Sequence, residues 1–180
     1  MTFAATSIRL IESTDASVIA DHLARDEEAS SRWDPKRPPE FYTTKGQIER
    51  IELLLGQYLS GQSWPGVIVS DGAVIGQITI SGILRGPFQK GYLGYWVASP
   101  FQNMGHASRA VTMVLRVMSE DLGLHRAEAS TQIDNFASHK VLRNNGFGTW
   151  GTAHSHIYIA EEWRDSLFWE RTLSKEAPSV

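Results

Sequence analysis

Cysteine is absent from this chain of 180 residues. Its absence excludes disulfide bonds, thiolate metal sites and any covalent acyl intermediate on a cysteine sulfur. The chain also lacks an apolar run of the ~20 residues needed to span a bilayer, and its N-terminus lacks the charged-then-apolar pattern of a secretion signal. We therefore expect a cytoplasmic protein that has no membrane partner.

A basic surplus is also missing, because 17 Lys and Arg residues stand against 20 Asp and Glu residues, for a formal net charge of −3. Proteins that bind a phosphate backbone usually concentrate positive charge, so we expect no direct contact with nucleic acid. The sequence has no internal repeat and no low-complexity tract. Its length suits a single domain, covering residues 1–180, with a substantial core.

Hydrophobic periodicity predicts a mixed α and β chain in the order β-α-α-β-β-β-α-β-α-β-β. The acidic residues 26–28 are expected at the solvated end of the first helix, and Asp71-Gly72 indicates a hairpin turn between two β-rich runs. The expected strands cover residues 7–11, 67–69, 73–83, 90–97, 126–131, 149–159 and 163–173. The expected helices cover residues 14–25, 47–59, 105–122 and 136–145.

The most informative segment joins the fourth strand to the third helix. It consists of Gln102, Asn103, Met104, Gly105, His106 and Ala107. Free N–H groups at a helix start attract anions, and a glycine there lets a diphosphate approach without meeting a Cβ. The alternative is a turn glycine before a buried helix, and this segment alone leaves both interpretations open. The Walker pattern and the three-glycine dinucleotide pattern are both missing.

The spacing Q-x-x-G-x-A resembles the acyl-CoA pyrophosphate loop of the GNAT family of N-acetyltransferases. Tyr92–Val97 precedes the loop, and Asp134–Phe147 follows it with a stretch similar to the family's D-N-x-x-S…G-F segment. Trp33–Pro38 and Arg85–Phe88 narrow the resemblance to the RimJ/RimL branch, which acetylates the α-amino group of ribosomal proteins. The resemblance spans nearly the whole chain, and its motifs occur in the family's order.

This resemblance implies an α+β fold with a mostly antiparallel, seven-stranded sheet that is splayed at its central strands and flanked by about four helices. It implies acetyl-CoA as cosubstrate, with its diphosphate on the segment 102–107. Main-chain groups of Trp96, Val97 and Ala98 would pair with the pantetheine amides. The Val97 N–H would face the thioester carbonyl, where one fixed donor can lower a barrier by about 3–4 kcal/mol.

The resemblance also implies roles for two residues at the start of the fourth helix. Asn135 would bind the pantetheine through its side-chain amide, although a helix N-cap is an equally good interpretation. Ser138 would protonate the departing CoA thiolate, or be an inert helix residue, because a thiol with a pKa near 8.5 needs little acid help. Many family members have a tyrosine farther along this helix, but residues 141–146 contain none.

A general base is harder to assign, because residues 90–96 contain no carboxylate where many acetyltransferases have a glutamate. Glu128, Asp134 and Asp34 are the nearest alternatives, and we expect none to act alone and favour a water relay. At pH 7 an α-amine with a pKa near 7.8 is roughly 14 percent neutral, and a lysine only about 0.04 percent. A site without a strong base therefore favours an N-terminal α-amine as acceptor.

Other functions remain open from the sequence alone. The acceptor could be a small basic amine, such as an antibiotic or a polyamine, in a pocket made acidic by Glu27, Glu28, Asp34 and Glu40. The protein could also be a non-catalytic acyl-CoA sensor. The oligomeric state, monomer or homodimer, is undetermined.

Two further groups of residues could suggest a ligand site. His154 and His156 are expected on one strand face, but no third metal ligand accompanies them, so we predict no metal site. Four tryptophans are expected to serve packing rather than ligand binding. They are Trp64, Trp150, Trp163 and Trp169.

Overall fold

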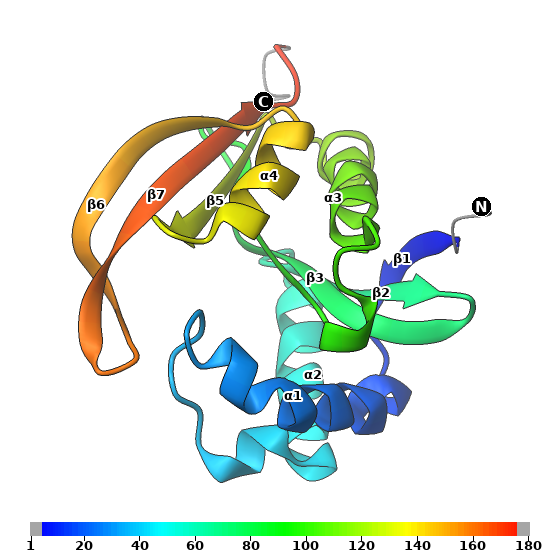
Figure 1. Cartoon of the computed structure of the whole chain (residues 1–180). Coiled ribbons are helices and arrows are strands. Elements are labelled where there is room, and N and C mark those ends of the chain that lie inside the picture. The colour runs from blue at the N-terminus through cyan, green and yellow to red at the C-terminus, as the bar shows by residue number, and fades with distance from the viewer. Residues whose placement is uncertain (1–4, 176–180) are drawn as a thin grey trace.

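The computed structural model describes residues 5–175 and confirms the predicted order of strands and helices (Figure 1). The strands are β1 (Thr6–Leu10), β2 (Trp64–Ser70), β3 (Ala73–Leu84), β4 (Lys90–Val97), β5 (Arg126–Gln132), β6 (Gly148–Ile159) and β7 (Glu162–Thr172). The helices are α1 (Ala16–Ser30), α2 (Thr44–Leu59), α3 (His106–Arg116) and α4 (Phe136–Asn144). Short helical turns are η1 (Ser13–Asp15), η2 (Pro39–Tyr42), η3 (Ser99–Phe101) and the π-helical η4 (Val117–Asp121).

The seven strands form one sheet in the order β1-β2-β3-β4-β5-β7-β6. Every neighbouring pair is antiparallel except β4 and β5, which run parallel. These two strands pair over only three residues each, Lys90–Tyr92 and Arg126–Glu128. Beyond this paired stretch, residues 93–97 of β4 and residues 129–132 of β5 do not pair with each other. We call this opening the split, and it confirms the predicted separation of the central strands.

The four helices cover the two faces of the sheet (Figure 1). Helices α1 and α2 pack on one face around Ile19, Ile51 and Val67. Helices α3 and α4 pack on the other face, where the apolar stripe of α3, including Val111 and Val114, is fully buried. Along β4 the side chains alternate, so that Leu93, Tyr95 and Val97 belong to the α3 and α4 face, whereas Trp96 packs against the core under α1 and α2.

The end of the first helix differs from the sequence prediction. Helix α1 continues to Ser30 instead of ending near Arg25, because no helix-breaking residue occurs before Pro35. The acidic run therefore lies within the helix, and the Asp26 carboxylate accepts hydrogen bonds from the N–H and hydroxyl of Ser99 at 2.7 and 2.6 Å.

None of the helices within residues 5–175 combines the length and the apolar character that crossing a bilayer requires.

The closed end of the split is held by a buried carboxylate. Glu128 on β5 accepts hydrogen bonds from Lys90 on β4 at 2.9 Å and from Arg126 at 2.7 Å. Burial by itself would raise the pKa of Glu128, but the bonds from Lys90 and Arg126 outweigh it and hold the pKa below its ordinary value. These three residues belong to the short paired stretch, so their charges fix where β4 and β5 meet.

We predict that Glu128→Gln destabilises the fold by about 1–3 kcal/mol at pH 7, because two partly buried cations lose their shared anion. The folded pKa of Glu128 is depressed, so its stabilisation is complete above the unfolded value of about 4.3 and is lost as the pH falls through the folded pKa. Urea unfolding at pH 7 and at lower pH measures both effects. Glu120→Gln, at an exposed position, is the matched control. A difference between Glu128→Gln and the parent that does not narrow at low pH would contradict the prediction.

Candidate active site

The end of β4 presents a main-chain donor to the split. The Ala98 N–H donates to Ile75 O on the neighbouring strand at 2.8 Å. Since successive residues of a strand direct their main-chain groups to opposite sides, the Trp96 N–H faces β3 and the Val97 N–H faces the split. The Val97 carbonyl accepts a hydrogen bond from Gln102 Nε2 at 2.8 Å, which agrees with this direction. Among Trp96, Val97 and Ala98, Val97 is the residue whose N–H the sheet does not use.

The segment 102–107 forms a tight turn into α3. Asn103 and Gly105 both have left-handed backbones, with φ of 60° and 80°. Gly105 is the N-cap of α3, and the first intrahelical donor is the Arg109 N–H, which bonds Gly105 O at 3.1 Å. The N–H groups of the first turn, from His106 to Ser108, precede that donor and face outward without a capping side chain. The geometry is that of an anion-binding helix start.

Side chains from α3 hold this turn against β1. His106 is 2% exposed, and its Nδ1 lies 2.8 Å from Thr6 Oγ1. Burial and the Arg109 charge lower the pKa of His106, so its ring is neutral at neutral pH. Arg109 donates to Thr6 Oγ1 at 2.7 Å and to Met104 O at 3.0 Å. Because the His106 side chain points into the protein, His106 can bind an anion only through its main-chain N–H.

Asn135 begins α4 beside the end of β5. Its Oδ1 accepts a hydrogen bond from the Ser138 N–H at 3.1 Å, which confirms the N-cap interpretation. The amide Nδ2 has no hydrogen-bond partner within residues 5–175, so Asn135 offers a donor while its oxygen caps the helix.

A pair of hydroxyl groups links β4 to α4. Tyr95 Oη lies 2.8 Å from Ser138 Oγ. Burial raises the pKa of Tyr95 to about 12, against a smaller opposing effect of the Ser138 bond, so the phenol stays protonated at neutral pH. Sequence reasoning did not single out Tyr95. The available signal was its place two residues before Val97, on the same face of the strand.

The three carboxylates proposed from the sequence differ in their surroundings. Glu128 is committed to Lys90 and Arg126. Asp134 accepts from Arg32 at 2.8 Å and from Arg164 at 3.1 Å, and the Arg32 bond in particular lowers its pKa.

Asp34 is different, because its carboxylate has no hydrogen-bond partner among residues 5–175. Asp34 is exposed to solvent, yet the protein atoms that surround its carboxylate raise its pKa, and the Arg37 charge opposes this effect only in part.

The loop that carries Asp34 is fastened to the end of β5. Gln132 Nε2 donates to Arg32 O and Trp33 O, both at 3.1 Å. The Oε1 atom of the same side chain is buried and has no partner within residues 5–175. The end of β5 therefore carries a buried acceptor whose hydrogen-bonding capacity these residues leave unused.

The prediction for the two histidines needs correction. His154 bonds Asp165 at 2.8 Å and His156 bonds Ser166 at 3.0 Å, and these neighbours on β7 point to opposite faces. The expectation of one shared face was wrong, because β6 is irregular between Ala153 and Ile157.

Among the tryptophans, Trp169 is buried. Trp150 and Trp163 are 52% and 63% exposed, but their rings pack on Phe168 and Tyr158, with centroids 5.5 and 5.6 Å apart. Within residues 5–175, no group of three or more His, Asp or Glu side chains could hold a metal ion.

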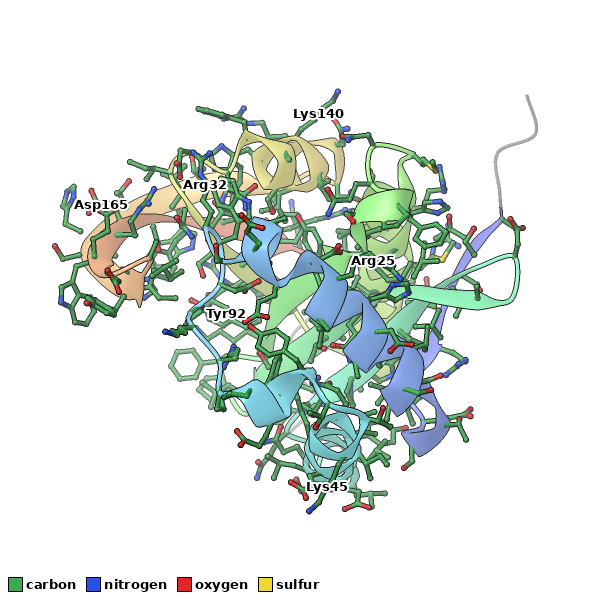
Figure 2. All side chains as sticks on the ribbon, turned by 60° about the horizontal axis from the view of Figure 1, so that its bottom comes forward. Arg25, Arg32, Lys45, Tyr92, Lys140 and Asp165 are labelled. Carbon is green, nitrogen blue, oxygen red and sulfur yellow. The ribbon has the colours of Figure 1, made fainter. Side chains whose placement is uncertain are left out.

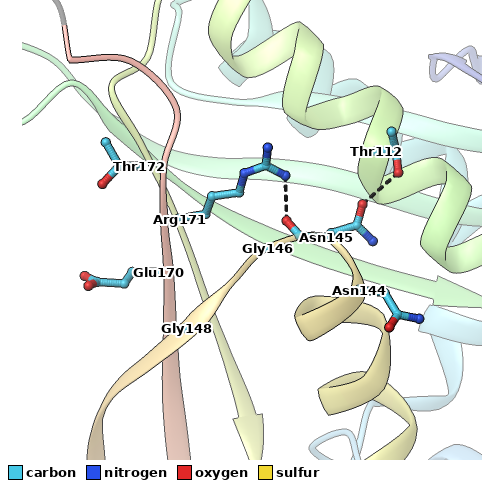
Figure 3. A pocket seen from close by; sticks show the side chains of 8 residues that line it. All are labelled: Thr112, Asn144, Asn145, Gly146, Gly148, Glu170, Arg171 and Thr172. Atoms are coloured by element: carbon cyan, nitrogen blue, oxygen red, sulfur yellow. Dashed lines mark hydrogen bonds between the residues drawn. The ribbon is translucent and has the colours of Figure 1, made fainter.

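A polar hollow of about 620 Å³ lies at the other end of β5 (Figure 3). Its lining includes Glu170 and Thr172, and Thr172 pairs with Arg126 at the start of β5. Two lining groups are joined to Asn145, whose carbonyl accepts from Arg171 at 2.5 Å and whose Oδ1 accepts from Thr112 at 2.7 Å. The hollow is thus separate from the split. The hydrogen bonds in its wall join the end of α4 to α3 and to β7.

Residues 6–148 match the family model described as acetyltransferase (GNAT) domain. The chain therefore belongs to the GNAT family of acetyltransferases, which are enzymes. Within that family it lies in the RimJ/RimL branch, as its motifs predicted.

Three similar proteins are informative. The ribosomal protein uS5-alanine N-acetyltransferase of Escherichia coli is 28% identical over 162 residues, 89% of this chain and 84% of that protein. A ribosomal-protein-S5-alanine acetyltransferase from Vibrio fischeri is 31% identical with a TM-score of 0.92, covering 99% of this chain and 98% of that one. Mycobacterium smegmatis RimJ, in complex with CoA-disulfide, is 27% identical with a TM-score of 0.90, over 93% and 81% of the two chains.

Removing the Asn135 cap is expected to destabilise the protein by about 1 kcal/mol in Asn135→Ala, since one N–H of the α4 start loses its acceptor. Asn135→Asp keeps a capping oxygen and should unfold at nearly the parent temperature. Thermal unfolding at neutral pH measures the difference, which should be about 2–4 °C for the alanine variant. Asn144→Ala, at an exposed position near the other end of α4, is the control. Equal losses in both Asn135 variants would contradict the capping role.

Proposed function

We propose that this protein is an acetyl-CoA-dependent N-acetyltransferase whose acceptor is the N-terminal α-amine of a protein or peptide. One observation carries the proposal: an anion-binding helix start lies directly after the strand end whose Val97 N–H faces the split. A diphosphate and a thioester joined by an extended arm require these two features side by side.

The cosubstrate fits the groups that are available. The first-turn N–H groups of α3 would receive the diphosphate, and Gly105 keeps that approach free of a Cβ. The Asn135 amide would donate to the pantetheine arm in the split, while its oxygen remains the helix cap. The structure of Mycobacterium smegmatis RimJ in complex with CoA-disulfide supports this assignment.

The residues around the split then act on the transfer as follows. The Val97 N–H donates to the thioester oxygen as negative charge develops there, while the amine nitrogen bonds the acetyl carbon and the carbon–sulfur bond breaks. The Ser138 hydroxyl donates its proton toward the departing sulfur, and the Tyr95 hydroxyl donates to Ser138 Oγ. Asp34, whose pKa burial raises, takes the proton that the amine releases, directly or through water.

The acceptor is assigned from two lines of support. Relatives at 28% and 31% identity are named as acetyltransferases of an alanine on a ribosomal protein. No strong base stands on β4, which suits an amine that is partly neutral at pH 7. A polyamine pocket fits less well, because Arg37 and Arg50 both lie over the Phe41 ring in the region where the acidic pocket would have to form.

The proposal is tested by incubating the protein with acetyl-CoA and an acceptor panel, and measuring released CoA and acetylated product by mass spectrometry. The panel pairs a peptide with a free N-terminus against the same peptide with a blocked N-terminus and an internal lysine, and adds small amines. We expect acetylation of the free α-amine only. CoA binding without release from any acceptor would favour a sensor, and turnover only with small amines would favour that alternative.

The diphosphate site predicts that Gly105→Val weakens CoA binding by about tenfold or more, a loss of at least 1.4 kcal/mol. Valine crowds the anion, brings a Cβ to within 2.8 Å of Arg109 Nη1, and strains a backbone whose φ is +80°. Gly123→Val is the control, since it introduces the same strain at φ +59° where a Cβ meets nothing within 4 Å. Titration calorimetry with CoA measures both variants. Unchanged affinity in Gly105→Val would refute the placement of the diphosphate.

The hydroxyl pair predicts a non-additive pattern of turnover numbers. Ser138→Ala should lower kcat by less than about tenfold, because a thiolate with a pKa near 8.5 leaves readily. Tyr95→Phe should lower kcat less, and the double variant should match Ser138→Ala, because Tyr95 acts through Ser138. Tyr158→Phe, on the exposed β6–β7 hairpin, is the control. Additive losses would show that the two hydroxyls act independently.

A further inference from the structure

Arg50 on α2 is a partly buried cation without an anionic partner. Its Nη1 donates to Gln77 Oε1 at 3.2 Å and lies 3.5 Å from Gln47 Oε1. Among residues 5–175 no carboxylate oxygen lies within 4.0 Å of its guanidinium. Its Nε and Nη2 have no hydrogen-bond partner in that range, and neither is a fully buried atom. These two atoms are therefore accessible donors, on a group whose burial lowers its pKa.

A second cation lies beside it. Arg37 stands over the Phe41 ring at 5.2 Å, and Arg50 stands over the same ring at 5.7 Å. The Arg37 charge further lowers the pKa of Arg50, so the two groups repel each other. The Arg37 charge also acts on the Asp34 carboxylate, but Asp34 forms no ion pair with Arg37 or Arg50 within 4.0 Å. A partly buried guanidinium that is desolvated and repelled by a second cation is stabilised by an anion, and the described residues supply none within 4.0 Å of Arg50.

Arg50 lies close to the proposed reaction centre. Gln77 Oε1, which accepts from Arg50, also accepts from Trp96 Nε1 at 3.1 Å, and Trp96 precedes Val97. The next residue on this face of β4 is Gly94, which is exposed, and a Cβ built there would meet no atom within 4 Å. Figure 2 looks onto this face, with α1 and α2 in front and Tyr92 labelled. Open space thus lies at Gly94, two residues from the Trp96 that shares Gln77 with Arg50, on the face of the split opposite α3 and α4.

We propose that Arg50, assisted by Arg37, binds a carboxylate that the acceptor carries close to the amine to be acetylated. The inference rests on the proposed function and names its substrate class: an acidic acceptor. The adjacent Nε and Nη2 atoms of a guanidinium match the two oxygens of a carboxylate. The carboxylate can belong to an Asp or Glu side chain near a peptide N-terminus, or be the α-carboxylate of a single amino acid.

Matched acceptors test the proposal with the full chain and acetyl-CoA. Two peptides differ only in Glu or Gln at the second position, and free alanine is compared with alaninamide. The parent protein should favour one carboxylate acceptor over its neutral partner by at least about tenfold in kcat/KM. Preference within the peptide pair identifies a side-chain carboxylate, and preference within the alanine pair identifies an α-carboxylate.

Arg50→Gln should abolish that preference while changing kcat/KM for the neutral acceptor much less. Arg37→Gln should reduce the preference in part, and Arg116→Gln, exposed on α3, should leave it unchanged. Affinity for CoA and the unfolding temperature establish that each variant is folded. Should Arg50→Gln fail to fold, Arg50→Lys replaces it and should weaken the preference, because an ammonium group lacks the planar fork.

The result is distinguishable from failure of the proposed function. Transfer to neutral and acidic acceptors at equal rates would overturn the anion site and leave the acetyltransferase assignment intact. If no acceptor is acetylated, titration calorimetry of the same acceptor pairs against the CoA-bound protein still tests whether Arg50 binds the carboxylate. Binding of the carboxylate member that is at least about tenfold tighter in the parent, and lost in Arg50→Gln, supports the site, whereas equal binding overturns it.

Discussion

The early end of the β4–β5 pairing is the constraint on which the rest of the molecule depends. Parallel strands that are hydrogen-bonded over their whole length would leave no free main-chain donor, and here the pairing stops after three residues on each strand. The Lys90–Glu128–Arg126 cluster fixes the paired end. Because the sheet twists, strands anchored at one end only diverge, and the divergence frees the Val97 N–H.

The groups around the split are held in place before any ligand arrives. Gln102 ties the helix start of α3 to the end of β4, and Arg109 ties the same turn to β1. Asn135 caps α4, and the Tyr95–Ser138 contact joins that helix to β4. Donors that are already oriented need no reorganisation when charge develops, and this is the main source of electrostatic stabilisation in enzyme sites.

The two faces of the split have different chemistry. On the α3 and α4 face, the proposed CoA site uses main-chain N–H groups and neutral hydroxyls. On the other face, Arg37 and Arg50 lie over one aromatic ring, and Asp34 is the carboxylate whose pKa burial raises. The proposed preference for an acidic acceptor rests on the two arginines of this face, and so on the electrostatics of the acceptor side more than on the fold.

Local patterns along the chain were enough for the element order, the amphipathic stripe of α3, the Asp71-Gly72 turn and the helix start at Gly105, because each depends on residues close in sequence. The resemblance to the GNAT family added the prediction of the split and the assignment to the RimJ/RimL branch. The Tyr95–Ser138 contact, the commitment of Glu128 to two cations and the unpaired Arg50 could not be read in advance, since each joins residues that are far apart in the chain. Distances and burial between such residues exist only after the sheet and helices have packed, and those quantities decide which charges and hydroxyls remain free to act.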